Sequence, residues 1–249
     1  MLRHLFILIL CFLIPGMLHA EEKVDSTADY SFQWKKTIVP AACIAVGAWG
    51  VDNGFLVKKK RQYDNWIGEQ LGTKRKTFDN YMQYAPLVMY FGMQPLGAKT
   101  KHEFRERLCI GANSYLLVLA LTQGPKHIIN ERRPDSSKNN SFPSGHTATA
   151  FCGAELVRLE YGGWYGTSAY ALATLTAFMR TYNHRHWLND LVAGAGIGIL
   201  SARVGSWLMP MERHLFGWDK KEKAPAMMAM PYYSSFEGGQ IGASMAVVF

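Results

Sequence analysis

The stretch WLNDLVAGAGIGILSARVGSWLM, residues 187–209, is the segment that says most about the fold. Apolar residues fill nearly all of it, and Gly194, Gly198 and Ala202 recur at intervals of four. Residues four apart lie on one face of an α-helix, and small side chains on that face let a second helix approach closely. The stretch therefore predicts a long helix packed inside a helical bundle.

Other apolar stretches of helical length precede this one, separated by short polar joints rich in Gly and Pro. The stretch just before it repeats the pattern, with Ala169, Ala173 and Ala177 four apart. We predict an all-α fold, a helical bundle of about five to six core helices. The expected helices cover residues 37–51, 80–97, 108–123, 144–160, 166–180 and 187–209.

Both ends of the chain differ from this pattern. Residues 1–20, MLRHLFILILCFLIPGMLHA, have a basic start, an apolar run, a Pro-Gly break and a small last residue, which is typical of a secretory signal; an uncleaved N-terminal anchor is the alternative. Residues near the C-terminus alternate and contain Gly238-Gly239, which favours a short hairpin. We expect a signal or anchor at 1–20, a helical domain at 21–215 and a tail at 216–249.

Membrane residence is favoured by the apolar stretches and their small residues, although a soluble bundle remains the alternative. The apolar run from Leu108 to Thr122 is short, because fifteen residues rise only about 22 Å against a hydrocarbon core of about 30 Å. Glu155 and Arg203 inside apolar stretches, and a mean hydropathy of −0.07, favour the soluble form. We expect the stretch at 37–51 to lie at the membrane interface.

The charge balance narrows the class of partner. The chain has 27 Lys and Arg against 19 Asp and Glu, so its surface favours anionic partners. It has no zinc-ligand spacing and no glycine-aromatic repeat, so phosphate-bearing lipids or metabolites are favoured over nucleic acid. Seven of the basic residues lie at 57–76, a segment that can form a basic amphipathic surface on a membrane or, alternatively, a solvated loop.

Three polar clusters lie at the ends of apolar stretches. After 108–123 come Lys126 and Arg133, and at the start of 144–160 the sequence reads Pro143-Ser144-Gly145-His146. Proline suits the first turn of a helix, where free backbone amides and the helix dipole bind oxyanions. The third cluster is RTYNHRHWLND, residues 180–190.

The two histidines of this third cluster are not equivalent. His186 and Asp190 are four residues apart, so Asp190 can accept from one imidazole nitrogen and leave the other free to attack. His184 lacks that support, and a spacing of two points the histidines to different sides of a helix, which does not suit a metal. Cations, backbone amides and an imidazole fit phosphate ester chemistry.

Together the clusters resemble the three-part signature of the type 2 phosphatidic acid phosphatase family, which includes class A acid phosphatases and vanadium haloperoxidases. The matching positions run in order from Lys126 to Asp190, and Met179 stands where the family usually has serine. The resemblance implies a metal-independent phosphatase without a cofactor, in which His186 forms a phosphohistidine, Asp190 orients it and His146 serves as acid and base. It also implies phosphate binding by Lys126, Arg133, Ser144, Gly145 and Arg180.

Taken one at a time, the clusters are more typical of a solvated loop, a helix start and a surface hydrogen bond. Jointly they favour a phosphatase of a membrane lipid, such as lipid A, a prenyl phosphate or a phospholipid phosphate, in the bacterial inner membrane with the site facing the periplasm. The alternatives are a soluble periplasmic acid phosphatase, a vanadate-dependent haloperoxidase and a non-enzymatic membrane scaffold. No nucleic acid partner is expected, and the sequence does not indicate the oligomeric state.

Overall fold

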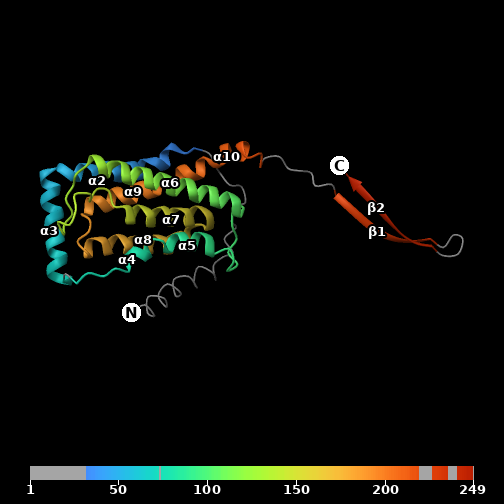
Figure 1. Cartoon of the computed structure of the whole chain (residues 1–249), viewed down its shortest axis with the longest axis horizontal. Helices are drawn as coiled ribbons and strands as arrows, with labels where there is room; N and C mark the ends of the chain where they lie inside the picture. Colours follow the sequence, from blue (N-terminus) through green and yellow to red (C-terminus); the bar gives the residue numbers. More distant parts are fainter. Residues whose placement is uncertain (1–31, 73, 219–225, 235–239, 249) are drawn as a thin grey trace. The chain divides into compact units, whose positions relative to one another are not determined.

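A computed structural model describes residues 32–72, 74–218, 226–234 and 240–248 (Figure 1). The signal or anchor expected at 1–20 lies outside these residues. The chain divides into two compact units, Met1–Met209 and Pro210–Phe249. The first is a helical bundle, so the predicted all-α core is confirmed.

Helices make up most of the described part of the first unit. The bundle begins with a 3-10 turn, η1 (Trp34–Thr37), and its helices are α2 (Ile38–Asp52), α3 (Gly54–Leu71), α4 (Asp79–Met82), α5 (Ala85–Gly92), α6 (Phe104–Ile128), α7 (Gly145–Tyr161), α8 (Gly163–Tyr182) and α9 (Leu188–Trp207). The single helix predicted at 80–97 is wrong: it is divided into α4 and α5. Pro86 lies in the first turn of α5, where its missing amide costs nothing, and so favours a new helix start there.

The centre of the bundle is α7, which packs against α5, α6, α8 and α9 (Figure 1). The small residues predicted to line a helix contact do so. A Cβ added at Gly194 of α9 would lie 2.6 Å from the carbonyl oxygen of Ser144, and Ala169, Ala173 and Ala202 are fully buried. Glycine in α9 therefore brings its backbone close to the start of α7.

The predicted length of the helix at 108–123 is wrong, because α6 runs for 25 residues, Phe104–Ile128. It starts earlier because Glu103 and Glu106 form a capping box, in which the amide of Glu103 donates to the Glu106 carboxylate at 3.1 Å. It ends later because Pro125 gives up one hydrogen bond without ending the last turn. At 1.5 Å per residue α6 is about 37 Å long, enough to cross a bilayer.

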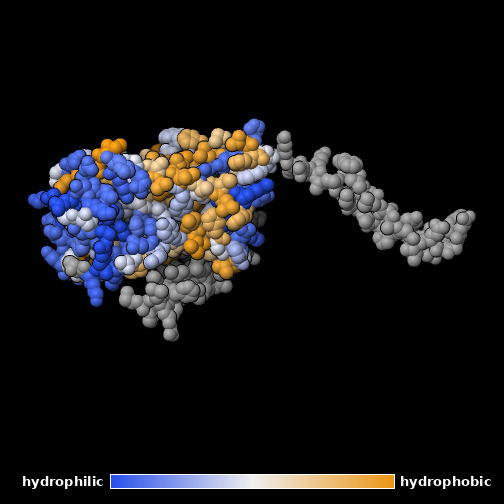
Figure 2. Space-filling view, in the orientation of Figure 1, coloured by the Kyte–Doolittle hydropathy of each residue, from blue (hydrophilic) through white to orange (hydrophobic). Residues whose placement is uncertain are grey.

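Within the residues that the structure describes, two stretches, Phe104–Ile128 and Leu188–Leu215, are long and apolar enough to span a membrane, and α2 with α3 forms a bent pair that passes the same criterion. Large apolar side chains of α6 face outward, with Leu116 64% and Leu119 55% exposed. Figure 2 shows hydrophobic surface around the middle of the helical unit and hydrophilic surface at the end where α3 lies. This distribution is that of a bundle whose flank contacts hydrocarbon.

Glu155 and Arg203, the charged residues that favoured a soluble bundle, pair with each other inside the bundle. Glu155 is fully buried and accepts hydrogen bonds of 2.6 Å from each of Arg158, Arg203 and Tyr170. A buried carboxylate with opposite charges and donors around it is compatible with an apolar environment.

The first helix packs along the last helix of the bundle. Residues 37–51, which we expect at the membrane interface, form α2, which packs on α9: a Cβ at Gly47 would meet Ala193 and one at Gly50 would meet Asn189. The segment that turns is α3, which makes an angle of 90° with α2 and lies across the end of the bundle (Figure 1). Asn53 starts α3 by accepting from the amide of Leu56 at 3.1 Å.

The second unit contains the predicted C-terminal hairpin. Strands β1 (Ala226–Ser234) and β2 (Gln240–Val248) pair antiparallel, with Ala226 opposite Val248 and Ser234 opposite Gln240. The short helix α10 (Met209–Leu215) begins at the boundary between the units. The hairpin prediction is confirmed.

Candidate active site

The candidate site is built around the N-terminus of α7. Ser144 is its N-cap residue and its hydroxyl accepts from the amide of Thr147 at 3.4 Å, so this side chain serves the helix itself. The amides of Gly145 and His146 lie in the first turn, which is the positive end of the helix dipole. Lys126, in the last turn of α6, reaches this point: its Nζ lies 3.6 Å from the position of a Cβ added at Gly145. A lysine beside a helix N-terminus is an arrangement that can bind an anion.

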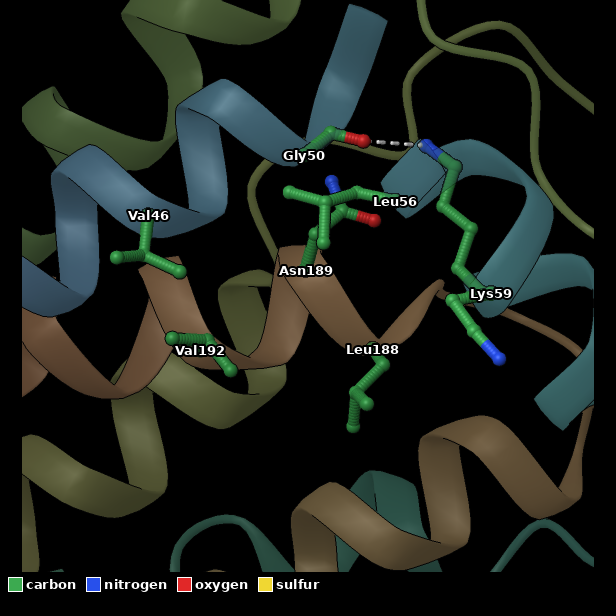
Figure 3. A pocket seen from close by; sticks show the side chains of 8 residues that line it. Val46, Gly50, Leu56, Lys59, Leu188, Asn189 and Val192 are labelled. Carbon is green, nitrogen blue, oxygen red and sulfur yellow. Dashed lines mark hydrogen bonds between the residues drawn. The ribbon is translucent and has the colours of Figure 1, made fainter. Parts of the chain in front are cut away.

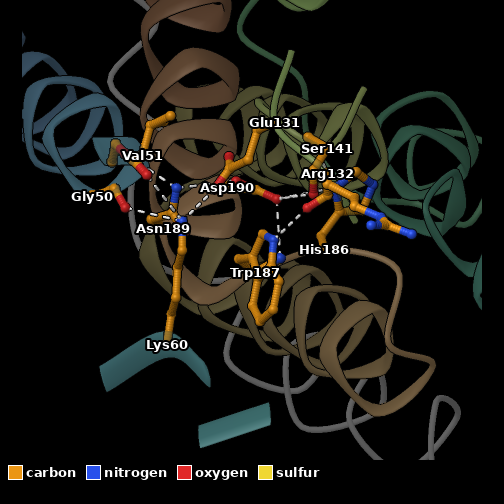
Figure 4. A network of polar contacts seen from close by, with 11 residues as sticks. Gly50, Val51, Lys60, Glu131, Arg132, Ser141, His186, Trp187, Asn189 and Asp190 are labelled. Carbon is orange, nitrogen blue, oxygen red and sulfur yellow. Dashed lines mark hydrogen bonds and ion pairs between the residues drawn. The ribbon is translucent and has the colours of Figure 1, made fainter. Parts of the chain in front are cut away.

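His186 lies at the junction between α8 and α9 and is 2% exposed. Its Nδ1 lies 2.8 Å from the carbonyl oxygen of Ser141, whereas Asp190 Oδ2 is 3.5 Å away. The hydroxyl of Ser141 donates to the same Oδ2 at 2.5 Å (Figure 4). Ser141 thus joins the histidine and the aspartate, and the Nε2 edge of the ring is left for chemistry.

The direct contact that we expected between His186 and Asp190 is therefore longer than the bond to Ser141. The helical spacing of four does not apply, because α9 begins at Leu188 and His186 precedes it. Asp190 instead caps α9 by accepting from the amide of Trp187 at 3.0 Å. Its own carbonyl accepts from the amide of Ser144 at 3.1 Å, so one residue ties the start of α9 to the start of α7.

Positive charge surrounds His186. Burial lowers the pKa of His186 well below its ordinary value, and the charges of Arg180, Arg133 and Lys126 lower it further, while the bond to Ser141 acts in the opposite direction. The imidazole is therefore neutral at physiological pH, which is the form that can attack phosphorus. The same three cations are the ones predicted to hold the phosphoryl oxygens.

His146 faces the same charges. Burial, together with the charges of Arg180, His186 and Lys126, lowers the pKa of His146 to about 3, although Asp79 opposes the shift. A bound phosphoryl dianion would supply negative charge at this point and raise the pKa again. Binding of an anion therefore favours the protonated form of His146.

Asp79 and Asn80 are site neighbours that nothing in the sequence pattern identified. Asp79, the first residue of α4, accepts from Arg180 Nη1 at 2.5 Å and is 1% exposed. Asn80 Oδ1 lies 3.1 Å from His146 Nε2. The short helix α4 therefore fixes one arginine and one histidine of the site, through contacts about 100 and 66 residues apart in sequence.

His184 belongs to a different environment. Its Nδ1 lies 2.8 Å from Asp64 Oδ1 of α3, and its ring also packs against Gly68 of that helix. Its φ is 52°, in the left-handed region, which reverses the chain between the two histidines. The tertiary structure thus brings together His186, His146, Asp190, Lys126, Arg133, Arg180 and the Gly145 amide, and places His184 against α3.

Two hollows lie beside the site and share one residue, Lys60. The first, of about 170 Å³, lies between α2, α3 and α9 and has apolar walls that include Val46, Leu56 and Val192 (Figure 3). The second, of about 350 Å³, is lined on its polar side by Glu131 and Arg133. Lys60 therefore separates an apolar hollow from a charged one. The basic segment was predicted as a surface feature, but Lys60 is buried and paired with Glu131.

Among the described residues no group of three or more His, Cys, Asp or Glu side chains could hold a metal ion. Donors for an anion are present instead. The Nε atoms of Arg133 and Arg180 are buried without a hydrogen-bond partner in the part of the chain that the structure describes. Such donors are costly unless a ligand or water accepts from them.

A family model matches the region that contains the site. Residues 107–214, from α6 to α10, match the model of the PAP2 superfamily. The resemblance found in the sequence is confirmed.

Individual proteins are similar to parts of this chain. A lipid A 1-phosphatase of Porphyromonas gingivalis is 36% identical over 141 residues, which cover 55% of this chain and 32% of that protein. The chain thus spans about a third of the length of this relative. The crystal structure of LpxE from Aquifex aeolicus is 22% identical with a TM-score of 0.45, over 58% of this chain and 92% of the other. A transmembrane PAP2 type phosphatidylglycerolphosphate phosphatase from Bacillus subtilis is 17% identical with a TM-score of 0.45, over 77% and 99% of the two chains.

Proposed function

We propose that this protein is a membrane phosphatase that hydrolyses a phosphate monoester of a lipid through a phosphohistidine on His186. The observation that carries the proposal is the meeting of three cations and a helix N-terminus around a buried, neutral imidazole. This arrangement neutralises the phosphoryl oxygens and supplies a nucleophile without a metal.

The proposed reaction has two steps. In the first, Nε2 of His186 forms a bond to phosphorus while the bond from phosphorus to the lipid oxygen breaks, and His146 gives its proton to that oxygen. In the second, His146 takes a proton from water, the resulting hydroxide attacks phosphorus, and inorganic phosphate leaves His186. Lys126, Arg133, Arg180 and the Gly145 amide hold the charge that develops on the phosphoryl oxygens.

Lipid A is the substrate that we propose first, with prenyl phosphates and phospholipid phosphates as the other members of the class. The name of the Porphyromonas gingivalis relative supports this choice. The apolar flank of α6 and the polar end at α3 support a site at a membrane surface. We place the protein in the inner membrane with its site toward the periplasm, consistent with basic residues at 99–107 on the opposite side.

The test of this function separates membranes from the soluble fraction of an expressing cell and assays both against a lipid phosphate and a small aryl phosphate. We expect lipid phosphatase activity in the membrane fraction. Activity confined to the soluble fraction, and only on the aryl phosphate, would support a broad-specificity acid phosphatase instead. Bromide oxidation that depends on vanadate would support a haloperoxidase.

Chelation and vanadate test the chemistry. We expect activity to survive EDTA, because cations and backbone amides stabilise the transition state in the proposed mechanism. Orthovanadate should inhibit, since it adopts the five-coordinate geometry of the phosphoryl transfer. Complete loss with EDTA that a divalent ion restores would overturn the mechanism.

The exposed lysines at the basic end test the substrate class. Lys58, Lys59, Lys74 and Lys76 are exposed, and an exposed lysine near an anionic surface contributes about 1 kcal/mol to binding. Replacing all four by Gln should raise the KM for a lipid phosphate in anionic vesicles by about tenfold or more and leave hydrolysis of a soluble aryl phosphate nearly unchanged. Lys60 is kept, because it is buried.

The matched control replaces Lys35 and Lys99 by Gln, two exposed lysines that do not belong to the basic segment. This variant should behave like the wild type on both substrates. Equal loss on both substrates in the fourfold variant would show a folding defect, and no loss on either would show that the segment is only a solvated surface.

A further inference from the structure

A buried charge cluster lies on the side of Asp190 that is away from His186 (Figure 4). It consists of Lys60 of α3, Glu131 of the loop after α6, and Asp190 of α9. Their exposed fractions are 7%, 9% and 0%. One cation and two carboxylates so deeply buried carry an uncompensated negative charge unless a proton joins them.

Lys60 is fully coordinated. Its ammonium donates to the carbonyl oxygens of Gly50 at 3.0 Å and Val51 at 3.4 Å, and it forms an ion pair with Glu131 Oε1 (Figure 4). The same ammonium lies 5.5 Å from the centre of the Trp187 ring. Lys60 therefore links the end of α2, the α3 helix and the start of α9 at one point.

Glu131 has one carboxylate oxygen on Lys60 and the other without a donor. Its Oε2 is buried and no donor in the described residues reaches it. The Asp190 carboxyl lies beside the Glu131 carboxyl (Figure 4), and the two acidic groups influence each other's titration. The backbone oxygen of Glu131 also accepts from the amide of Ser141 at 2.9 Å. Glu131 thus lies next to Ser141 and Asp190, the two residues that lie beside Nδ1 of His186.

A proton shared by the two carboxyls would give Glu131 Oε2 the hydrogen bond that it otherwise lacks. Burial, the charge of Asp190 and the hydrogen bond with Asp190 together raise the pKa of Glu131 to about 8, although Lys60 acts in the opposite direction. A protonated Glu131 can donate from Oε2 to Asp190, which leaves Asp190 as the ionised partner of Ser141 and of the Trp187 amide.

Resting on the phosphatase function proposed above, we propose that Glu131 and Lys60 are positioning residues: Glu131 donates a shared proton to Asp190, and Lys60 ties this carboxyl pair to α3. The alignment of Asp190, Ser141 and His186 then depends on a residue of a helix that lies across the end of the bundle. Neither Glu131 nor Lys60 contacts the phosphoryl group in this proposal.

The proposal predicts an alkaline limit to activity. Below the raised pKa, Glu131 is protonated and the hydrogen bond to Asp190 is present; above that pKa the proton is lost and two negative charges face each other. The charged groups that face Glu131 or line the same hollow are Lys60 and Arg61 from α3, Arg132 and Arg133 from its own loop, and Asp190 from α9. A fall in kcat above about pH 8 is expected in the wild type.

Glu131→Gln and Glu131→Ala separate this role from a merely structural one. Glutamine keeps the shape, donates from its amide nitrogen to Asp190 and accepts from Lys60 with its oxygen, but it does not titrate. On a soluble aryl phosphate, Glu131→Gln should keep kcat at pH 7 within about threefold and lose the alkaline limb. Glu131→Ala should lower kcat by about 10- to 100-fold with KM nearly unchanged, the size found for groups that orient a catalytic ligand or base.

The matched control for the carboxyl is Glu69→Gln, an exposed residue of α3 that should show the wild-type profile. If Glu131→Gln is as damaged as Glu131→Ala while both melt like the wild type, the shared proton is refuted. If Glu131→Gln keeps the alkaline limb, another group causes that limb and the proposal is also refuted.

Lys60→Met tests the proposed role of Lys60, with Lys58→Met, at an exposed position two residues earlier in α3, as the control. Loss of the ammonium removes the one group that lowers the pKa of Glu131, so the alkaline limb should move to higher pH. Unchanged pH dependence in Lys60→Met would overturn the assignment of Lys60. Failure of the proposed function looks different, because the wild type itself would then hydrolyse neither phosphate ester.

Discussion

Replacing His186 by alanine is expected to abolish turnover, with a fall in kcat of about 10⁴-fold or more, the order found when the nucleophile of a covalent mechanism is removed. The reason is that His186 alone combines a buried neutral imidazole with three surrounding cations and an Nδ1 held by Ser141. Turnover of a lipid phosphate and of an aryl phosphate should fall together, because both need the same nucleophile.

His184→Ala is the matched control, because it removes the neighbouring histidine. Its imidazole pairs with Asp64 of α3, and a partly exposed ion pair of this kind is worth only about 0–1 kcal/mol, so turnover should fall by less than about fivefold. Quenching the reaction with a labelled substrate and mapping the phosphorylated residue should place the label on His186. Label on His184 would disprove the assignment.

Lys126→Met is expected to give the second largest loss, about 10²- to 10³-fold in kcat, as for removal of one donor from a preorganised oxyanion site. Lys126 reaches the first turn of α7 and adds its charge where the phosphoryl oxygens are proposed to lie. The variant should also shift the pH profile. The charge of Lys126 helps to keep the pKa of His186 low, so its removal raises that pKa and moves the acid limb of kcat/KM to higher pH.

Lys138→Met, at an exposed position of the loop after α6, serves as control and should keep the wild-type rate and profile. Measuring kcat and kcat/KM on an aryl phosphate from pH 4 to pH 9, together with the melting temperature, checks both expectations. A loss in Lys126→Met of less than about threefold would remove Lys126 from the phosphate site.

The sequence was sufficient for the type of fold and the chemical inventory of the site. Small residues at intervals of four in α8 and α9 predicted close helix packing, because that spacing lies on one helical face whatever the tertiary structure is. The motifs from Lys126 to Asp190 were sufficient to predict the site residues. Each motif lies at a helix end, where backbone amides or carbonyls are free. These are local properties, which neighbouring residues determine.

Helix ends and orientations were harder to predict. Gly124-Pro125 suggested an end for α6, yet the helix continues, because a proline near the last turn removes a single hydrogen bond and tertiary packing compensates for it. The orientation of α2 depended on α9, whose glycines admit its backbone, and such complementarity is not visible in either segment alone.

By itself the sequence determined an all-α bundle, a C-terminal hairpin and the residues available for phosphate chemistry. Only the tertiary structure decided which of them act together. In the folded chain His184 contacts Asp64, whereas His186 contacts the carbonyl oxygen of Ser141. Asp79 accepts a hydrogen bond from Arg180, 101 positions away in sequence. Lys60 is buried and pairs with Glu131, 71 positions away. The physical reason is that a buried charge must find an opposite charge or a proton wherever the fold supplies one, and long-range packing rather than local spacing determines that partner.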